Sequence, residues 1–88
     1  MSKRGKTRKA AKFVCKSMDM SIKPPAFKRL TPAAQAAWHM CYSKQLTRRA
    51  AHIKKQRERR WLVSQAKDQL KWAESIRRRH SVGPVEVV

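Results

Sequence analysis

The sequence predicts an all-α, non-globular fold in which a basic arm and an extended connector precede one long helix and a short extended tail. No Gly or Pro stands between Pro32 and Gly83, and this stretch is rich in Ala, Gln, Lys and Arg, which favour helix. Only six of the 88 residues are aromatic, which leaves little material for a core. At about 1.5 Å per residue, an unbroken helix over 31–80 is roughly 70 Å long, too long to be buried in this chain.

The first predicted element is a basic arm over residues 1–17 that is disordered when free. It holds seven Lys and Arg and no acid, interspersed with small residues that cannot form a core. Its composition overlaps with that of mitochondrial transit peptides, but no amphipathic apolar stripe precedes Phe13. We therefore expect an arm that is retained in the working protein.

Two further segments lack helical character. Residues 18–30 predict an extended connector, because Pro24-Pro25 favours extended or polyproline backbone geometry. Residues 81–88 have a strand-like composition and form a tail that either adds to the sheet edge of a neighbour or lies across a surface. With the arm and the helix, these make four segments, none of which is expected to be an independent globular domain.

Both ends of the helix over 31–80 carry sequence signals. Thr31 can accept a hydrogen bond from the first turn, and Pro32 occupies the position where a missing N–H costs nothing. At the other end, three arginines and His80 complement the negative end of the helix dipole. Gly83 and the proline after it then supply a residue that tolerates a left-handed backbone and one that cannot continue a helix.

Apolar residues within the predicted helix form two narrow stripes. At about 100° per residue, the first stripe comprises Tyr42, Leu46, Ala50 and Ile53. The second lies roughly opposite and comprises Leu62, Ala66, Leu70, Ala73 and Ile76. Between them, residues 54–60 hold five cations and one acid. The chain is either a straight rod whose halves touch different neighbours, or it bends near 54–60 and folds into a hairpin. The absence of a turn signal favours the straight rod.

Cys15 and Cys41 are too few for a disulfide scaffold and are expected to be free thiols. We predict no metal site, because zinc ligands occur in pairs at short regular spacing, whereas His39 and Cys41 point about 200° apart on a helix. Five scattered carboxylates and two glycines offer neither a catalytic arrangement nor a phosphate loop. We therefore expect no enzyme activity, no cofactor and no small-molecule substrate.

No uncharged run is long enough to span a membrane, and the basic N-terminus lacks the apolar face of a membrane-surface helix. The formal net charge of +18 instead calls for a polyanionic partner. Arginine forms forked hydrogen bonds with phosphate, and dense positive charge supplies affinity. The cations predicted to bind RNA are Lys3, Arg4, Lys6, Arg8, Lys9, Lys12, Lys44, Arg48, Arg49, Lys54, Lys55, Arg57, Arg59 and Arg60.

The apolar stripes are predicted to bind neighbouring proteins. The residues expected at these contacts are Tyr42, Leu46, Ile53, Leu62, Leu70 and Ile76. The three tryptophans, Trp38, Trp61 and Trp72, are expected to pack on protein rather than to stack on bases.

The basic arm over 2–16 and the basic helical stretch over 44–61 resemble, in type, the small accessory proteins of ribosomes, and of mitochondrial ribosomes in particular. The resemblance rests on charge and helical character and not on a family-specific motif. It implies an arm that threads between rRNA helices and a long helix that touches RNA on one side and protein on the other. The implied partners are rRNA and neighbouring ribosomal proteins, and the implied localisation is mitochondrial, with cytoplasm or nucleus as alternatives.

Two other functions stay open at this point. One is a small arginine-rich regulatory adaptor, viral, phage-encoded or nuclear, that folds on RNA and grips a polymerase or another protein. The other is a DNA-packaging or chromatin protein. No helix-turn-helix, zinc finger or zipper is visible, which favours RNA over DNA. The sequence therefore predicts a structural RNA-binding component of a ribonucleoprotein particle.

Overall fold

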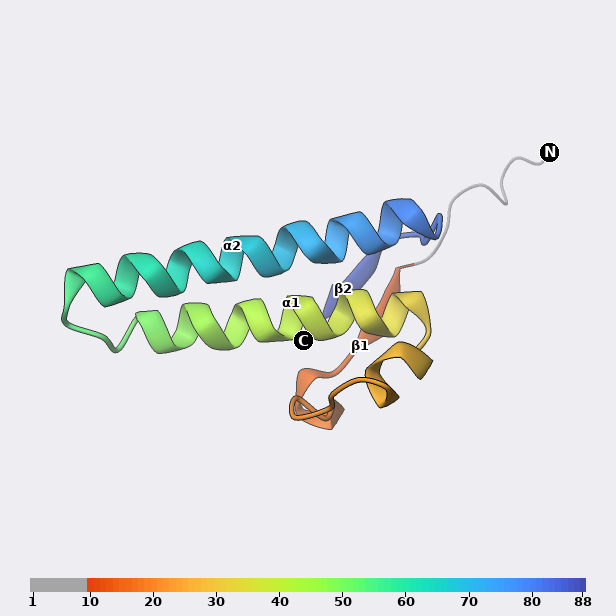
Figure 1. Cartoon of the computed structure of the whole chain (residues 1–88), viewed down its shortest axis with the longest axis horizontal. Helices are drawn as coiled ribbons and strands as arrows, with labels where there is room; N and C mark the ends of the chain where they lie inside the picture. Colours follow the sequence, from red (N-terminus) through yellow and green to blue (C-terminus); the bar gives the residue numbers. More distant parts are fainter. Residues whose placement is uncertain (1–9) are drawn as a thin grey trace.

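The computed structural model describes residues 10–88, in which two antiparallel helices form a hairpin and a small sheet packs beside it (Figure 1). In chain order the elements are β1 (Ala11–Phe13), the 3-10 helices η2 (Cys15–Ser17) and η3 (Ala26–Arg29), α1 (Pro32–Ala50), α2 (Gln56–Arg79) and β2 (Val85–Val87). The predicted all-α, non-globular fold with one long helix is therefore wrong. The arm residues before Ala10 lie outside the described part of the chain.

The predicted start of the long helix is confirmed as the start of α1. Thr31 has an extended backbone, and its Oγ1 accepts a hydrogen bond from the Ala34 N–H at 3.1 Å. Pro32 follows at the first helical position, where it removes no hydrogen bond. The Gln35 side chain adds a bond from Nε2 to the Leu30 carbonyl at 3.0 Å. Local side-chain chemistry alone thus accounts for this helix end.

The helix does not continue to His80 as predicted but breaks over residues 51–55. This break contains neither Gly nor Pro, and Lys55 precedes α2 without a side-chain cap. The turn is instead closed by Arg59, whose Nε and Nη2 donate to the Ile53 carbonyl at 3.1 and 2.7 Å. Because the donor is charged, these bonds are strong replacements for the backbone bond that a continuous helix would give this carbonyl.

Burial of the two apolar stripes accounts for the chain reversal. One buried cluster consists of Leu46, Ala50, Leu62 and Ala66, with Tyr42 and Ile53 packed at its margin. In the hairpin the stripes cover each other, whereas on a straight rod both would stay in water until neighbours bind. The straight rod is therefore wrong, and its alternative, the hairpin, is the observed arrangement.

A second cluster joins the open end of the hairpin to the sheet. Its buried members are Ala36, Ala37, Ala73 and Val85, and its partly buried members include Phe13, Met18, Met40, Ile76 and Val87. β1 and β2 pair in parallel, with Ala11 opposite Val85 and Phe13 opposite Val87. Part of the predicted arm and the predicted tail are thus strands that pair with each other, which neither an all-α fold nor a disordered arm anticipates.

The segment between β1 and α1 folds back on itself rather than extending as predicted. It contains η2 and η3, with a cis peptide bond at Pro24-Pro25. A disulfide joins Cys15 of η2 to Cys41 of α1, so the prediction of free thiols is wrong. From η3, the Phe27 ring meets the Trp38 ring edge-on with centroids 5.3 Å apart. The disulfide and this aromatic contact hold the segment against α1.

α2 ends one residue before the predicted position, and a serine takes the role expected of glycine. Ser81 has a φ of 53°, in the left-handed region, whereas Gly83 has no positive φ. The Val82 N–H bonds to the Arg77 carbonyl at 2.8 Å. The Ser81 N–H bonds to the Arg78 carbonyl at 3.4 Å, and the two bonds together form a Schellman motif. This motif turns the chain toward β2.

Candidate nucleic-acid interface

The hairpin gathers the cations of the helix midsection around one end of the molecule, where α1 turns into α2 (the left end of Figure 1). We call them the tip cations, and all are exposed: Arg48, Arg49, Lys54, Lys55, Arg57, Arg59 and Arg60. Lys44 is exposed as well but lies farther along α1, beside Val87 of β2. Glu58 is the one acid between residues 44 and 60. On a straight rod the same residues would be spread over about 18 Å of one axis. Folding therefore concentrates positive charge at the hairpin turn.

Five tip cations surround the N-terminus of α2, where the backbone is itself electropositive. A helix N-terminus carries unpaired N–H groups and a partial positive charge, so nearby cations destabilise it and anions stabilise it. Glu58 is the acid of the first turn, and the cap residue Lys55 supplies no side-chain hydrogen bond. This charge arrangement works against the free helix and becomes favourable when a polyanion covers it.

A row of basic side chains follows one face of α1. Lys44, Arg48 and His52 are spaced four residues apart and therefore share a face. A shallow hollow of about 310 Å³ on this face is lined by Gln45, Arg48, Arg49 and His52. The row thus extends the electropositive surface from the turn toward the disulfide.

Lys16 joins this surface although it is absent from the predicted set. It lines a hollow of about 190 Å³ with Lys44 and Arg48, beside the disulfide. Its position follows from the bond between Cys15 and Cys41, which the sequence did not indicate. Two features of the sequence together point to Lys16: it belongs to the basic arm, and it follows a cysteine that pairs with Cys41.

Two predicted RNA-binding residues already hold intramolecular bonds. Arg59 uses two N–H groups to hold the Ile53 carbonyl at the turn. Lys44 donates from Nζ to the Val87 carbonyl at 3.1 Å. An ammonium group has three donors, so Lys44 retains capacity for a phosphate. The main contacts of Arg59 therefore stabilise the turn between α1 and α2.

The predicted cations of the arm fall mostly beyond the described residues. Those outside are Lys3, Arg4, Lys6, Arg8 and Lys9. Lys12 is exposed in the middle of β1, opposite Glu86 of β2. This register places an acid beside it, so Lys12 faces a less positive surface than the tip cations do.

The residues predicted to contact neighbouring proteins mostly pack within the chain. Leu46 and Leu62 lie in the first cluster with Tyr42 and Ile53 at its margin, and Ile76 packs in the second. Leu70 differs, because 48% of it is exposed. The two stripes therefore pack mainly against each other within the chain.

The three tryptophans differ in their surroundings. Trp38 packs between Phe27 and Tyr42, with its ring centroid 5.3 and 5.4 Å from theirs. Trp72 meets the His39 ring at 5.6 Å but stays 55% exposed. Trp61 is 61% exposed and lies one turn after Arg57, beside the tip cations. Its ring is therefore open to an unpaired base.

Within residues 10–88, no group of three or more His, Cys, Asp or Glu side chains is placed to hold a metal ion. Over the same range, no helix is both long enough and apolar enough to cross a bilayer. Comparison of the chain with protein-family models, with curated proteins and with solved structures finds no match. The case for a function therefore rests on the chain's own geometry, and its most distinctive surface is the one that the tip cations form.

Proposed function

We propose that this protein is a structural RNA-binding component of a ribonucleoprotein particle, in a ribosomal and specifically mitochondrial ribosomal setting. The observation that carries the proposal is the cluster of five cations around the N-terminus of α2, where they oppose the helix dipole. Such an arrangement costs stability in the free protein, so it calls for a bound polyanion. Backbone N–H groups and guanidinium groups at this end can both donate to phosphate oxygens.

RNA is favoured over duplex DNA by the form of this surface. The cations lie on a turn and on the sides of two helices, and the described elements form no helix-turn-helix, zinc finger or zipper that would seat a helix in a major groove. The exposed Trp61 ring beside Arg57 and Arg60 can stack on an unpaired base, which single-stranded RNA regions supply. Phosphate contacts give the affinity, and base reading contributes little.

Salt-dependent RNA binding tests the proposal directly. We expect the full chain to bind a labelled single-stranded RNA with a steep inverse dependence on salt, measured by fluorescence anisotropy. The double variant Arg57→Gln/Arg60→Gln should flatten the plot of log affinity against log salt by about 1.4, because each lost contact to single-stranded RNA removes about 0.7. The matched control is Lys67→Gln/Lys71→Gln, which removes the same charge from α2 away from the turn. Equal effects of the two variants would mean that net charge, and not the tip, binds RNA.

Two experiments separate the RNA-binding proposal from the DNA-packaging and regulatory-adaptor alternatives: competition between RNA and duplex DNA, and sedimentation with ribosomal subunits. A chain that prefers duplex DNA to RNA in competition would be a DNA-packaging protein. Tagged protein in the source cells should co-migrate with one ribosomal subunit after a high-salt wash. Recovery in the free or polymerase-bound fraction would point to a regulatory adaptor instead and would end the ribosomal proposal.

The disulfide bears on the compartment within this proposal. Structural disulfides are rare in cytosolic and nuclear proteins, where thiols are kept reduced. The bond between Cys15 and Cys41 therefore predicts that the protein works where this pair of thiols stays oxidised. Thiol labelling of the protein taken directly from cells tests this point, since a fully labelled protein would show that the bond does not form where the protein works.

A further inference from the structure

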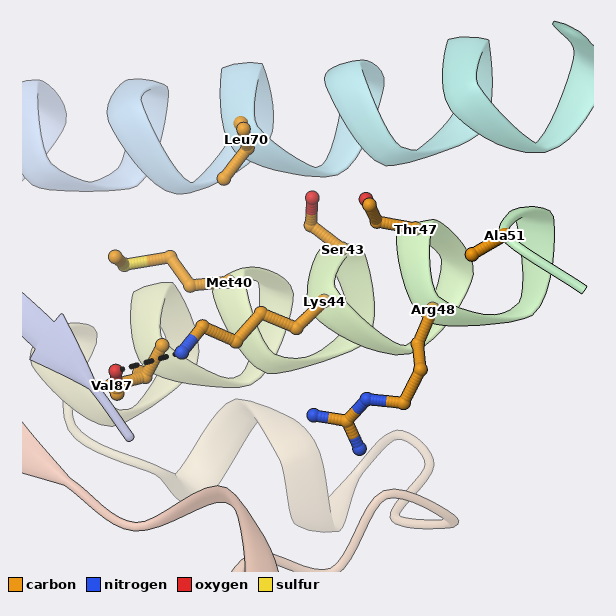
Figure 2. A pocket seen from close by; sticks show the side chains of 8 residues that line it. All are labelled: Met40, Ser43, Lys44, Thr47, Arg48, Ala51, Leu70 and Val87. Carbon is orange, nitrogen blue, oxygen red and sulfur yellow. Dashed lines mark hydrogen bonds between the residues drawn. The ribbon is translucent and has the colours of Figure 1, made fainter.

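We propose that the groove between α1, α2 and β2 docks an amphipathic helix with acidic flanks from a partner protein. The groove is a cavity of about 580 Å³, and Figure 2 shows the side chains that line it. An adjoining cavity of about 170 Å³ shares Met40 and Leu70 with it and continues to Val85. The inference goes beyond the RNA-binding proposal and does not rest on it, because the apolar residues of the groove play no part in that proposal, although Lys44 and Arg48 are common to both.

The floor of the groove is largely apolar, apart from the hydroxyl groups of Ser43 and Thr47, and it is incompletely covered by the chain itself. Leu70 points from α2 toward α1 (Figure 2) and is 48% exposed, unlike the other members of its stripe, which are buried or half-buried. Val63 lies two helical turns earlier on the same face of α2 and is 37% exposed. Met40 of α1 and Val87 of β2 complete the apolar surface. An exposed leucine beside an adaptable methionine is a suitable receptor for an apolar side chain.

The shape of the groove suits a helix. Its lining on α1 runs from Met40 to Ala51, eleven residues apart and thus about 16 Å or three helical turns. The groove follows the seam between two antiparallel helices, so a third helix laid along it forms a three-helix arrangement.

A strand suits the groove less well. Pro84 and Val88 pair with β1 through their backbone groups, and the carbonyl of Val87 between them accepts from Lys44 at 3.1 Å instead. One hydrogen-bonding position on the outer edge of β2 is therefore already occupied, which weakens the case for an added strand.

The charges at the rim define the chemistry of the occupant. Lys44 and Arg48 line the groove on the α1 side, and no acidic residue is among the described residues that line this cavity. Glu74 lines the adjoining cavity, but its carboxylate pairs with Arg77 at 3.1 Å and with Arg78 at 3.5 Å. A helix that places apolar residues on the floor and carboxylates against Lys44 and Arg48 is therefore complementary to the groove.

Other occupants fit these charges poorly. A second copy of the chain would bring another formal charge of +18 toward the cationic rim. Residues 1–9 of this chain contain five cations and no acid, so they are repelled as well. An RNA strand would find cations at the rim, but its phosphates would gain nothing from an apolar floor. The acidic amphipathic helix alone satisfies both the rim and the floor.

The test uses the full chain and a fluorescein-labelled helical peptide of about 18 residues with leucines at i, i+3, i+4 and i+7 spacing and glutamates beside them. We expect this peptide to bind, and we expect Leu70→Ser to weaken binding at least about tenfold. Arg48→Gln should weaken it more modestly. The matched control is Val14→Ser, which removes an apolar side chain that is also 48% exposed but lies outside the groove, and it should leave the affinity unchanged.

Two further peptides separate groove binding from general attraction to a basic protein. A scrambled peptide of the same composition keeps the charge but loses the apolar stripe, and a third peptide carries lysines in place of the glutamates; neither should bind comparably. NMR shift changes from the first peptide should centre on Met40, Leu70 and Val87. Equal binding of the scrambled peptide, no effect of Leu70→Ser, or shifts centred on the hairpin turn would overturn the proposal.

The remaining outcomes distinguish this proposal from others. A concentration-dependent dimer that Leu70→Ser dissociates would replace the partner helix by a second copy. An RNA hairpin that shifts the Leu70 methyl resonances would replace it by RNA. If the chain binds no RNA at all, the RNA-binding proposal fails while a positive peptide result stands. If RNA binds and the peptide does not, the groove proposal alone fails.

Discussion

His39 Nδ1 lies 2.6 Å from Gln69 Oε1, and this contact joins α1 to α2 between the two apolar clusters. Both residues are largely buried, with 9% and 6% exposed. Because an amide oxygen only accepts, Nδ1 carries the hydrogen and donates it. The His39 ring also meets the rings of Phe27 and Trp72 edge-on, at 5.7 and 5.6 Å. One polar bond in a mostly apolar interface thus sets the register of the hairpin.

Removal of the acceptor should destabilise the hairpin. Gln69→Leu leaves the His39 N–H buried without its partner, so we expect the free energy of unfolding to fall by about 1–3 kcal/mol. The double variant His39→Phe/Gln69→Leu should regain most of this loss, because neither side chain then needs a hydrogen bond. Urea denaturation followed by circular dichroism measures both. A single variant as stable as the native chain would show that the bond contributes nothing.

Replacing Arg59 should lower the stability of the protein more than replacing Arg57 or Arg60. Arg59→Gln removes both bonds to the Ile53 carbonyl, and we expect a loss of about 1–2 kcal/mol in the free energy of unfolding. Arg57→Gln and Arg60→Gln change the same charge nearby but should each alter stability by less than about 0.5 kcal/mol. Thermal melts and RNA affinities of the three variants test whether Arg59 acts on stability while Arg57 and Arg60 act on RNA binding. Equal melting temperatures of the three variants would contradict this assignment.

Local signals in the sequence account for the outer ends of the helical region but not for its middle. Thr31 and Pro32 place the start of α1 correctly because capping depends on neighbouring residues only. The break at 51–55 has no such signal, because it depends on contacts between Leu46 and Leu62 across the hairpin. The stretch contains no strong helix breaker, and tertiary packing overrides its preference for helix.

Long-range pairings were equally inaccessible to pattern analysis. The pairing of Ala11 with Val85 and the disulfide between Cys15 and Cys41 join residues far apart in the chain, and spacing alone does not reveal them. The predicted cations of residues 44–60 are exposed, as nucleic-acid binding requires, because charge density is visible without a fold. Lys16 was missed because only the disulfide brings it to α1.

The disulfide should contribute strongly to stability in so small a chain. It closes a separation of 26 residues, for which loop-closure entropy gives about 3 kcal/mol. We expect a reducing agent to lower the melting temperature of the native chain, and we expect no effect of the same agent on the double variant Cys15→Ser/Cys41→Ala. The variant is the control for unrelated effects of the reductant. Identical melts of the native chain with and without reductant would contradict a stabilising role.

The pKa of Asp19 is lowered from its ordinary value of 3.8, first by the Ser21 hydroxyl and then by the Ser21 N–H, which both donate to Oδ1. Since the folded pKa lies below the unfolded one, its contribution to stability is present above about pH 4 and is lost as pH falls through the folded pKa. Ser21→Ala removes the larger cause, so the pKa should rise toward 3.8. An NMR titration of the side-chain carboxyl carbon measures it. An unchanged value would show that the hydroxyl does not hold the carboxylate.

The hairpin predicts a sharp contrast between two leucines of one stripe. Leu62 is 6% exposed in the interface with α1, whereas Leu70 is 48% exposed in the groove. Leu62→Ala should therefore cost about 2–5 kcal/mol through lost burial and the cavity that it leaves. Leu70→Ala should cost less than about 1 kcal/mol, since half of its side chain gains nothing from folding. Urea denaturation of the two variants measures the difference. On a straight rod both leucines would face water in the free chain and the two substitutions would have similarly small effects, so a large cost at Leu62 alone separates the hairpin from the rod.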